Sequence, residues 1–225
     1  MKKIGKPAFT EVRDKYLHDR AFRGSVGIYG GMTLSFLYAT LKAVTGYLYF
    51  SVFALSSAVY YLILGCMRAG LAYAYRHKTD KGNADYERRC YRRTAWLLFL
   101  LNIPMGGVIL LMIRMNPSAA YPGYTIYASA TFTFYMMTLS VINLIKFQKC
   151  GSPILSAAKA LNFIAALMSV LGLQNALIST FSGNSENYRM LMNTLTGTGI
   201  YLAVVGIAIF MIYRSHHRER ENADE

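Results

Sequence analysis

Acidic and imidazole side chains are missing from most of this 225-residue sequence. No carboxylate occurs between Asp19 and Asp80, and none occurs between Glu87 and Glu186. These gaps hold long apolar stretches, each near the roughly 20 residues that a helix needs to cross a bilayer. The four histidines also fall outside the apolar stretches. Because cation sites and proton relays in membranes depend on such side chains, their absence excludes a carboxylate- or histidine-based site from these stretches.

Cysteine is scarce as well, and Cys66, Cys90 and Cys150 show no paired spacing. We expect reduced thiols near the cytoplasmic side, with Cys66 as a packing residue of an apolar helix. The sequence also lacks a nucleophile elbow, a phosphate loop and paired carboxylates within an apolar stretch. We therefore expect no enzyme activity, no cofactor and no metal site.

What the sequence does contain is apolar: 54% of its residues are hydrophobic and 16% are charged. Ordinary soluble domains carry about 25% charged residues. The pattern predicts an all-α, polytopic transmembrane bundle of six helices, at about 25–47, 52–75, 94–115, 124–147, 153–181 and 191–213. Around this transmembrane domain, 25–213, we expect a basic cytoplasmic N-terminal segment over 1–24, an Arg- and Lys-rich loop over 76–93 and a charged cytoplasmic tail over 214–225.

The net charge of +13 is concentrated at the ends of the apolar stretches, where a membrane protein needs it. If the N-terminus is inside, 19 of the 24 Lys and Arg residues fall on the inner side, and two, Arg114 and Arg189, fall on the outer side. This asymmetry predicts an even number of helices, both termini in the cytoplasm and a place in the plasma (cytoplasmic) membrane. The expected partners are the lipid bilayer and anionic lipids at its cytoplasmic face, and we expect no nucleic-acid partner.

Three cations, Lys42, Arg68 and Lys159, lie within the predicted helices. Their long side chains can reach outward to the membrane interface. Alternatively, they line a cytoplasm-facing cavity and attract an anion, in which case Arg68 and Lys159 form the pair to test. The sequence leaves both interpretations open.

Polar residues also mark the fifth predicted helix, in which Leu161, Ala165, Met168, Gly172 and Asn175 share one face. Such a face suits helix packing, with amide hydrogen bonds of about 1 kcal/mol each, or contact with a substrate. The candidate cavity or substrate contacts that we nominate are Ser57, Tyr60, Tyr61, Arg68, Lys159, Asn162 and Asn175.

Two segments resemble the cation diffusion facilitator (cation efflux) family. Residues 41–46 (LKAVTG) with 51–58 (SVFALSSA) look like that family's passage from the first to the second helix. Residues 143–144 (NL) with 152–161 (SPILSAAKAL) look like its passage from helix four into helix five. The resemblance implies a cation-efflux-like arrangement of six helices with both termini inside, and a homodimer.

The same resemblance fails at the metal site. Family members hold their metal with a His or Asp followed four residues later by Asp, on helices two and five. The matching positions here are Tyr60 with Leu64, and Leu161 with Ala165. Leucine and alanine cannot bind a metal, and a lone phenol is a poor ligand. The family's soluble metal domain is not expected either, because about a dozen residues follow the last predicted helix.

Two functions are consistent with these observations. The first is a transporter-like protein on a cation-efflux-type scaffold that lacks the usual zinc site, with an unassigned substrate. The alternative is a non-transporting membrane scaffold or regulator that acts through basic cytoplasmic surfaces on lipids or a partner protein. In that case Arg88, Arg89, Arg92 and Arg93 would carry the interaction.

Overall fold

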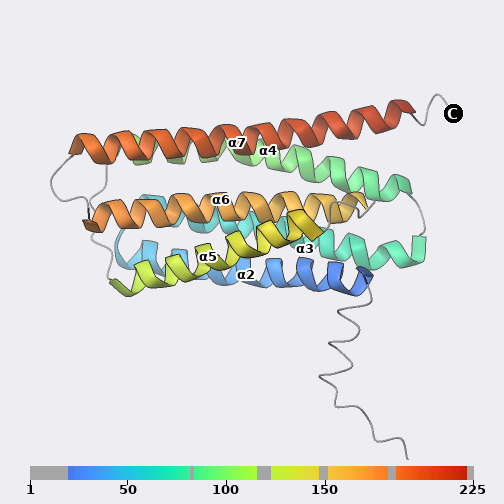
Figure 1. Ribbon diagram of the computed structural model, residues 1–225, viewed down its shortest axis with the longest axis horizontal. Coiled ribbons are helices and arrows are strands. Elements are labelled where there is room, and N and C mark those ends of the chain that lie inside the picture. The colour runs from blue at the N-terminus through green and yellow to red at the C-terminus, as the bar shows by residue number, and fades with distance from the viewer. Residues whose placement is uncertain (1–19, 82–83, 116–122, 147–151, 182–185, 222–225) are drawn as a thin grey trace, which may run out of the picture.

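The computed structural model is a bundle of long α-helices, and no strand occurs in the residues that it describes (Figure 1). The described ranges are 20–81, 84–115, 123–146, 152–181 and 186–221. The six helices are α2 (Arg20–Leu48), α3 (Val52–Lys81), α4 (Ala84–Met115), α5 (Gly123–Lys146), α6 (Pro153–Phe181) and α7 (Glu186–Glu221). The prediction of an all-α six-helix bundle is therefore confirmed. Of the predicted N-terminal segment over 1–24, residues 1–19 lie outside the described residues.

Four helices in the described part of the chain are long and apolar enough to cross a membrane. Their apolar spans are Val52–Arg76, Tyr86–Leu110, Pro153–Ile178 and Asn187–Ser215. Large apolar side chains are exposed midway along several helices, for example Leu37, Ile103 and Leu202. Water-soluble monomers rarely expose extended apolar surfaces of this kind, whereas lipid would cover them. These features fit a membrane protein.

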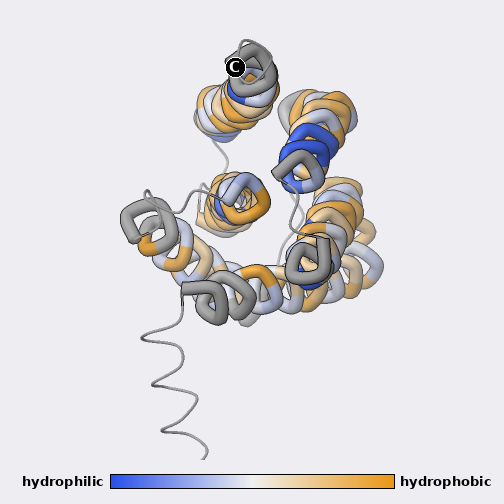
Figure 2. The backbone as a smooth tube through the Cα atoms, turned by 90° about the vertical axis from the view of Figure 1, so that its right-hand side faces the viewer, coloured by the Kyte–Doolittle hydropathy of each residue, from blue (hydrophilic) through white to orange (hydrophobic). Residues whose placement is uncertain are grey.

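Helix α6 lies at the centre of the bundle. It contacts α2, α3, α4, α5 and α7, and its apolar span is the most deeply buried of the four. Helices α2 and α3 pack along each other, as do α5 and α6, while α4 and α7 pair on one side of the bundle (Figure 2). Helix α6 therefore borders all five of the other helices.

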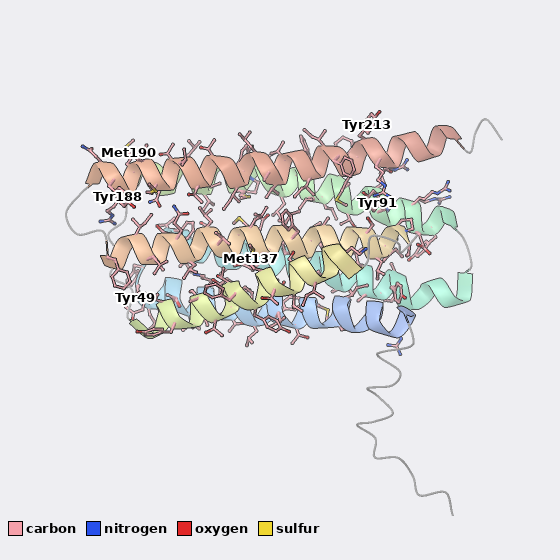
Figure 3. The ribbon with its side chains drawn as sticks, viewed as in Figure 1. Tyr49, Tyr91, Met137, Tyr188, Met190 and Tyr213 are labelled. Carbon is pink, nitrogen blue, oxygen red and sulfur yellow. The ribbon has the colours of Figure 1, made fainter. Side chains whose placement is uncertain are left out.

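The basic segments meet at one end of the bundle. That end holds the start of α2, the end of α3, the start of α4, the end of α5, the start of α6 and the end of α7 (Figure 1). This grouping follows because consecutive helices alternate in direction. Tyr91 and Tyr213 lie towards this end, and Tyr49 and Tyr188 lie towards the other (Figure 3). Tyrosines near both ends of an apolar region are typical of the two membrane interfaces.

The predicted loop over 76–93 is wrong, because both flanking helices continue into it. Helix α3 runs to Lys81 and α4 begins at Ala84. The segment contains no proline, and seven of its eighteen residues are Arg or Lys, which favour helix. Its charge marks where the helices leave the apolar region and does not end them. Near the start of α4, Glu87 is buried and accepts a hydrogen bond of 2.7 Å from the Ser152 hydroxyl.

The turn between α2 and α3 depends on a close approach of the two helices at Gly46. A Cβ atom placed on Gly46 would lie 2.8 Å from the backbone nitrogen of Leu55, which real Cβ atoms do not tolerate. The Gly46 carbonyl also accepts a hydrogen bond of 3.0 Å from the Ser51 N–H, and the Ser51 hydroxyl accepts one of 3.3 Å from Ala54. Ser51 thus caps the start of α3.

We expect Gly46→Ala to destabilise the protein by about 1–3 kcal/mol, because the added methyl group must push the two helix backbones apart. The measurement is the fraction folded against SDS mole fraction in mixed micelles. Gly70→Ala in α3 is the matched control, because nothing lies within 4 Å of its added Cβ, and there alanine should be neutral or gain up to about 1 kcal/mol. Equal effects of the two substitutions would contradict the close approach.

Candidate functional site: a polar column in the bundle core

Buried polar side chains form a column between α2, α3, α5 and α6, running along α6. Helix α2 contributes residues at successive turns of one face, and α3 and α5 add side chains that reach the backbone of α6. We define this polar column by its members Ser35, Tyr38, Lys42, Tyr61, Arg68, Thr133, Asn162 and Ser169, all of which are buried.

Arg68 occupies the end of the column nearer the start of α6, and its side chain is only 1% exposed. Its Nη1 donates hydrogen bonds to the Gly31 carbonyl and the Ser35 hydroxyl in α2. Its Nη2 donates to the Leu161 carbonyl in α6 at 3.0 Å. A planar guanidinium with several donors suits this link between two helices. For Arg68, the interpretation that the side chain reaches outward to the interface is therefore wrong.

Gly31 lets Asn162 and Arg68 approach the backbone of α2. A Cβ atom on Gly31 would lie 2.9 Å from the Asn162 side-chain oxygen and 3.3 Å from Nη1 of Arg68. Two nominated residues, Arg68 and Asn162, are thereby brought to one place. The Nε of Arg68 has no hydrogen-bond partner within the described residues, so this end of the column keeps one unused donor.

An aromatic cluster of Tyr38, Tyr61 and Phe132 fills the middle of the column. The Tyr38 and Phe132 rings are stacked with centroids 3.7 Å apart, and the Tyr61 ring stands edge-on to Tyr38 at 4.7 Å. The Tyr61 hydroxyl donates to the Ala165 carbonyl at 3.0 Å. On the α5 side, the Thr133 hydroxyl is 3.1 Å from the Ser169 carbonyl. The aromatic cluster therefore separates the two ends of the column.

Lys42 occupies the other end, and its side chain is 4% exposed. Its ammonium lies 5.2 Å from the centroid of the Tyr38 ring. It also lies against α6, because a Cβ atom on Gly172 would be 3.5 Å from Nζ. Within the described residues the ammonium makes no hydrogen bond and no ion pair. Lys42 therefore points into the bundle, and the interpretation that it reaches the interface is wrong for this residue too.

The remaining nominated residues fall elsewhere. Ser57 and Tyr60 line an apolar cavity between α3, α4 and α6. Asn175 is buried about one turn beyond Gly172 in α6. Lys159 is half-buried near the start of α6 and is not among the hydrogen-bond partners of Arg68. Arg68 is thus brought together with Asn162. The alternative in which Arg68 and Lys159 attract an anion together stays a prediction, and the column as defined does not include Lys159.

Five members of the site were not nominated from the sequence: Thr133 of α5, Ser169 of α6 and three residues of α2. The three from α2 are Ser35, Tyr38 and Lys42. A signal was present, because they follow Gly31 at steps of four, three and four residues, which places all four on one helix face. The interpretation that Lys42 reaches outward to the membrane interface hid this pattern.

The chemistry of the column is that of hydrogen-bond donors. Its ionisable groups are an ammonium, a guanidinium and two phenols. Among the described residues, no three His, Cys, Asp or Glu side chains gather to hold a metal ion. At the positions carried over from the cation efflux family, Leu64, Leu161 and Ala165 are fully buried apolar side chains. Donors of this kind complement an anion or a carbonyl-rich molecule and repel a metal cation.

No family model, no curated protein and no solved structure matches this chain. The resemblance to the cation efflux family therefore depends on the two short segments alone and stays a prediction. The geometry of the polar column is the remaining guide to function.

Proposed function

We propose that this chain is a six-pass membrane protein of transporter type whose polar column conducts an anionic solute. The observation that carries the proposal is the burial of Lys42 and Arg68 at opposite ends of the column, with no described carboxylate paired to either. Ionisable groups inside a membrane are costly and usually mark a path for ions or substrates. Because the column contains two cations and no buried acid among the described residues, it favours a negatively charged solute.

The two ends of the column are suited to successive contacts with one anion. Leu161, which binds Arg68, and Gly172, which touches Lys42, are eleven residues apart in α6. That separation is roughly 16 Å at about 1.5 Å per residue, or half of a hydrocarbon core of about 30 Å. A small anion would contact one cation at a time, and movement of the aromatic cluster would connect the two ends.

The proposal places both termini in the cytoplasm and the protein in the plasma membrane. It is supported by the gathering of the basic segments at one end of the bundle (Figure 1), because positive residues stay on the cytoplasmic side. Helices α2 and α5 would cross as well, because their sequences are mainly apolar over 29 and 24 residues. Their polar residues, such as Ser35 and Thr133, are buried in the bundle.

Uptake into sealed proteoliposomes tests the proposal. The panel contains halides, phosphate, sulfate, small carboxylates and nucleotides, with Zn²⁺ and Mn²⁺ as cations. We expect protein-dependent uptake of at least one anion and none of either metal. Absence of uptake for every anion would refute anion transport, and metal uptake would favour the cation-efflux resemblance over the column.

The alternative function, a non-transporting scaffold, is favoured by one observation. The start of α4 is held in place by the buried Glu87 and Tyr91, so that Arg88 and Arg92 are carried on a fixed helix. Each Lys or Arg near an anionic surface contributes about 1 kcal/mol. Absence of flux, together with binding to phosphatidylserine vesicles that fails when residues 88, 89, 92 and 93 are neutralised, would favour the scaffold. A homodimer, which the family resemblance implies, is compatible with either function.

A further inference from the structure

An apolar cavity lies between α3, α4 and α6, and none of the residues of the polar column lines it. Its volume is about 50 Å³, which is room for roughly four water-sized groups, so a bound molecule would leave part of its body against lipid. Its wall is almost entirely apolar and contains no charged side chain. It is therefore distinct in position and chemistry from the cation-lined column.

The cavity opens on the surface that would face lipid. Val59 and Pro104 form part of its wall and are exposed. Ile103, next to Pro104, is exposed as well. All three lie within the apolar spans of α3 and α4. A molecule dissolved in the bilayer would therefore reach the cavity without passing through water.

Among the described residues of the cavity wall, Tyr60 has the one buried polar atom without a hydrogen-bond partner. Its side chain lines the cavity and is 5% exposed, and its hydroxyl has no hydrogen-bond partner within the described residues. The neighbouring Tyr61 hydroxyl, by contrast, is bonded to Ala165. A buried hydroxyl without a partner destabilises the protein, so an oxygen acceptor brought by a ligand would be favoured.

We propose that this cavity binds a lipid-soluble molecule, taken from the bilayer, that consists of an apolar body and one uncharged oxygen acceptor such as a ketone or quinone carbonyl. The apolar wall holds the body, and the Tyr60 hydroxyl donates to the oxygen after a rotation of its side chain. The absence of Lys, Arg and His from the wall selects an uncharged group. Met168 and Leu171 of α6 complete the wall next to Ser169 and Gly172, so an occupant would press on the helix that borders the column.

Photolabelling of the whole protein in proteoliposomes tests this proposal. Three diazirine probes of equal length are used: one is a straight hydrocarbon, one carries a mid-chain ketone and one carries a carboxylate. We expect the ketone probe to label α3, α4 and α6 peptides about tenfold more strongly than the hydrocarbon probe does, the factor that about one net hydrogen bond provides. Tyr60→Phe should reduce ketone labelling to the level of the hydrocarbon.

Two further variants distinguish the cavity from the lipid-facing surface in general. Ser56→Leu fills the cavity from its α3 wall and should reduce labelling by the ketone and hydrocarbon probes. Gly70→Leu adds a similar side chain to the same helix at an open, exposed position and should leave labelling unchanged. Equal labelling by the ketone and hydrocarbon probes, labelling that survives Ser56→Leu, or stronger labelling by the carboxylate-bearing probe would each overturn the proposal. None of these outcomes depends on transport through the column.

Discussion

Lys42→Met is expected to make the protein more stable and, at the same time, inactive as an anion transporter. In the wild type the Lys42 ammonium is buried against the Tyr38 ring and Gly172, without a carboxylate or hydrogen-bond acceptor among the described residues. Taking such a charge out of water costs several kcal/mol, and a ring face returns only part of that. Methionine keeps the length and apolar stem of the side chain and removes the charge.

The expected gain in stability is about 1–4 kcal/mol, measured by SDS unfolding in mixed micelles. Anion uptake should fall at least about tenfold, because a lost charge-assisted contact of about 1.5–3 kcal/mol corresponds to that factor. Lys42→Arg keeps the charge and should retain part of the uptake. Lys159→Met removes one positive charge from a half-buried position outside the column and should leave uptake nearly unchanged.

A different pattern would assign Lys42 another role. If Lys42→Met destabilised the protein and left uptake of every anion intact, the ammonium would be a structural group bound to something that the described residues do not include. A stabilised and inactive variant is the signature of a residue kept for function at a cost in stability.

The architecture was largely predictable because apolar length determines where a helix can cross lipid. All six predicted helices are present, and the turn after Leu48 falls where residues 25–47 were expected to end. The error over 76–93 has a physical origin. Hydropathy reports where a segment leaves the apolar region, whereas helix continuation depends on backbone propensity and packing, as the buried Tyr91 illustrates.

The site was predictable in part. The face of α6 that includes Leu161, Ala165 and Gly172 was visible from spacing, and it does border the polar column. The inward direction of Lys42 and Arg68 was not visible. A cation near a helix end can turn either way, and the choice depends on which backbone carbonyls or rings a neighbouring helix presents. For Arg68 those partners lie 33 to 93 positions away in the sequence, a separation that local patterns do not report.

Arg68 gives the sharper test of the column, through a comparison of Arg68→Lys with Arg68→Met. Lysine keeps the charge, but its single ammonium cannot reach both α2 and α6 in the manner of the guanidinium, which bonds Gly31, Ser35 and Leu161. We expect Arg68→Lys to cost about 2–4 kcal/mol, because a buried charge is left with fewer partners. SDS unfolding again provides the measurement.

Arg68→Met should cost less, within about 1–2 kcal/mol, although it is the less conservative change. The carbonyls of Gly31 and Leu161 lie inside helices, so the N–H groups of Ser35 and Ala165, four residues on, still bond them when the guanidinium is gone. Methionine also brings no charge that needs a partner, and its flexible side chain can fill much of the space. Both variants should lose anion uptake. If methionine were instead the more damaging of the two, the guanidinium would be a clamp that holds α2 to α6, and Lys42 alone would have to account for the preference for a negative charge.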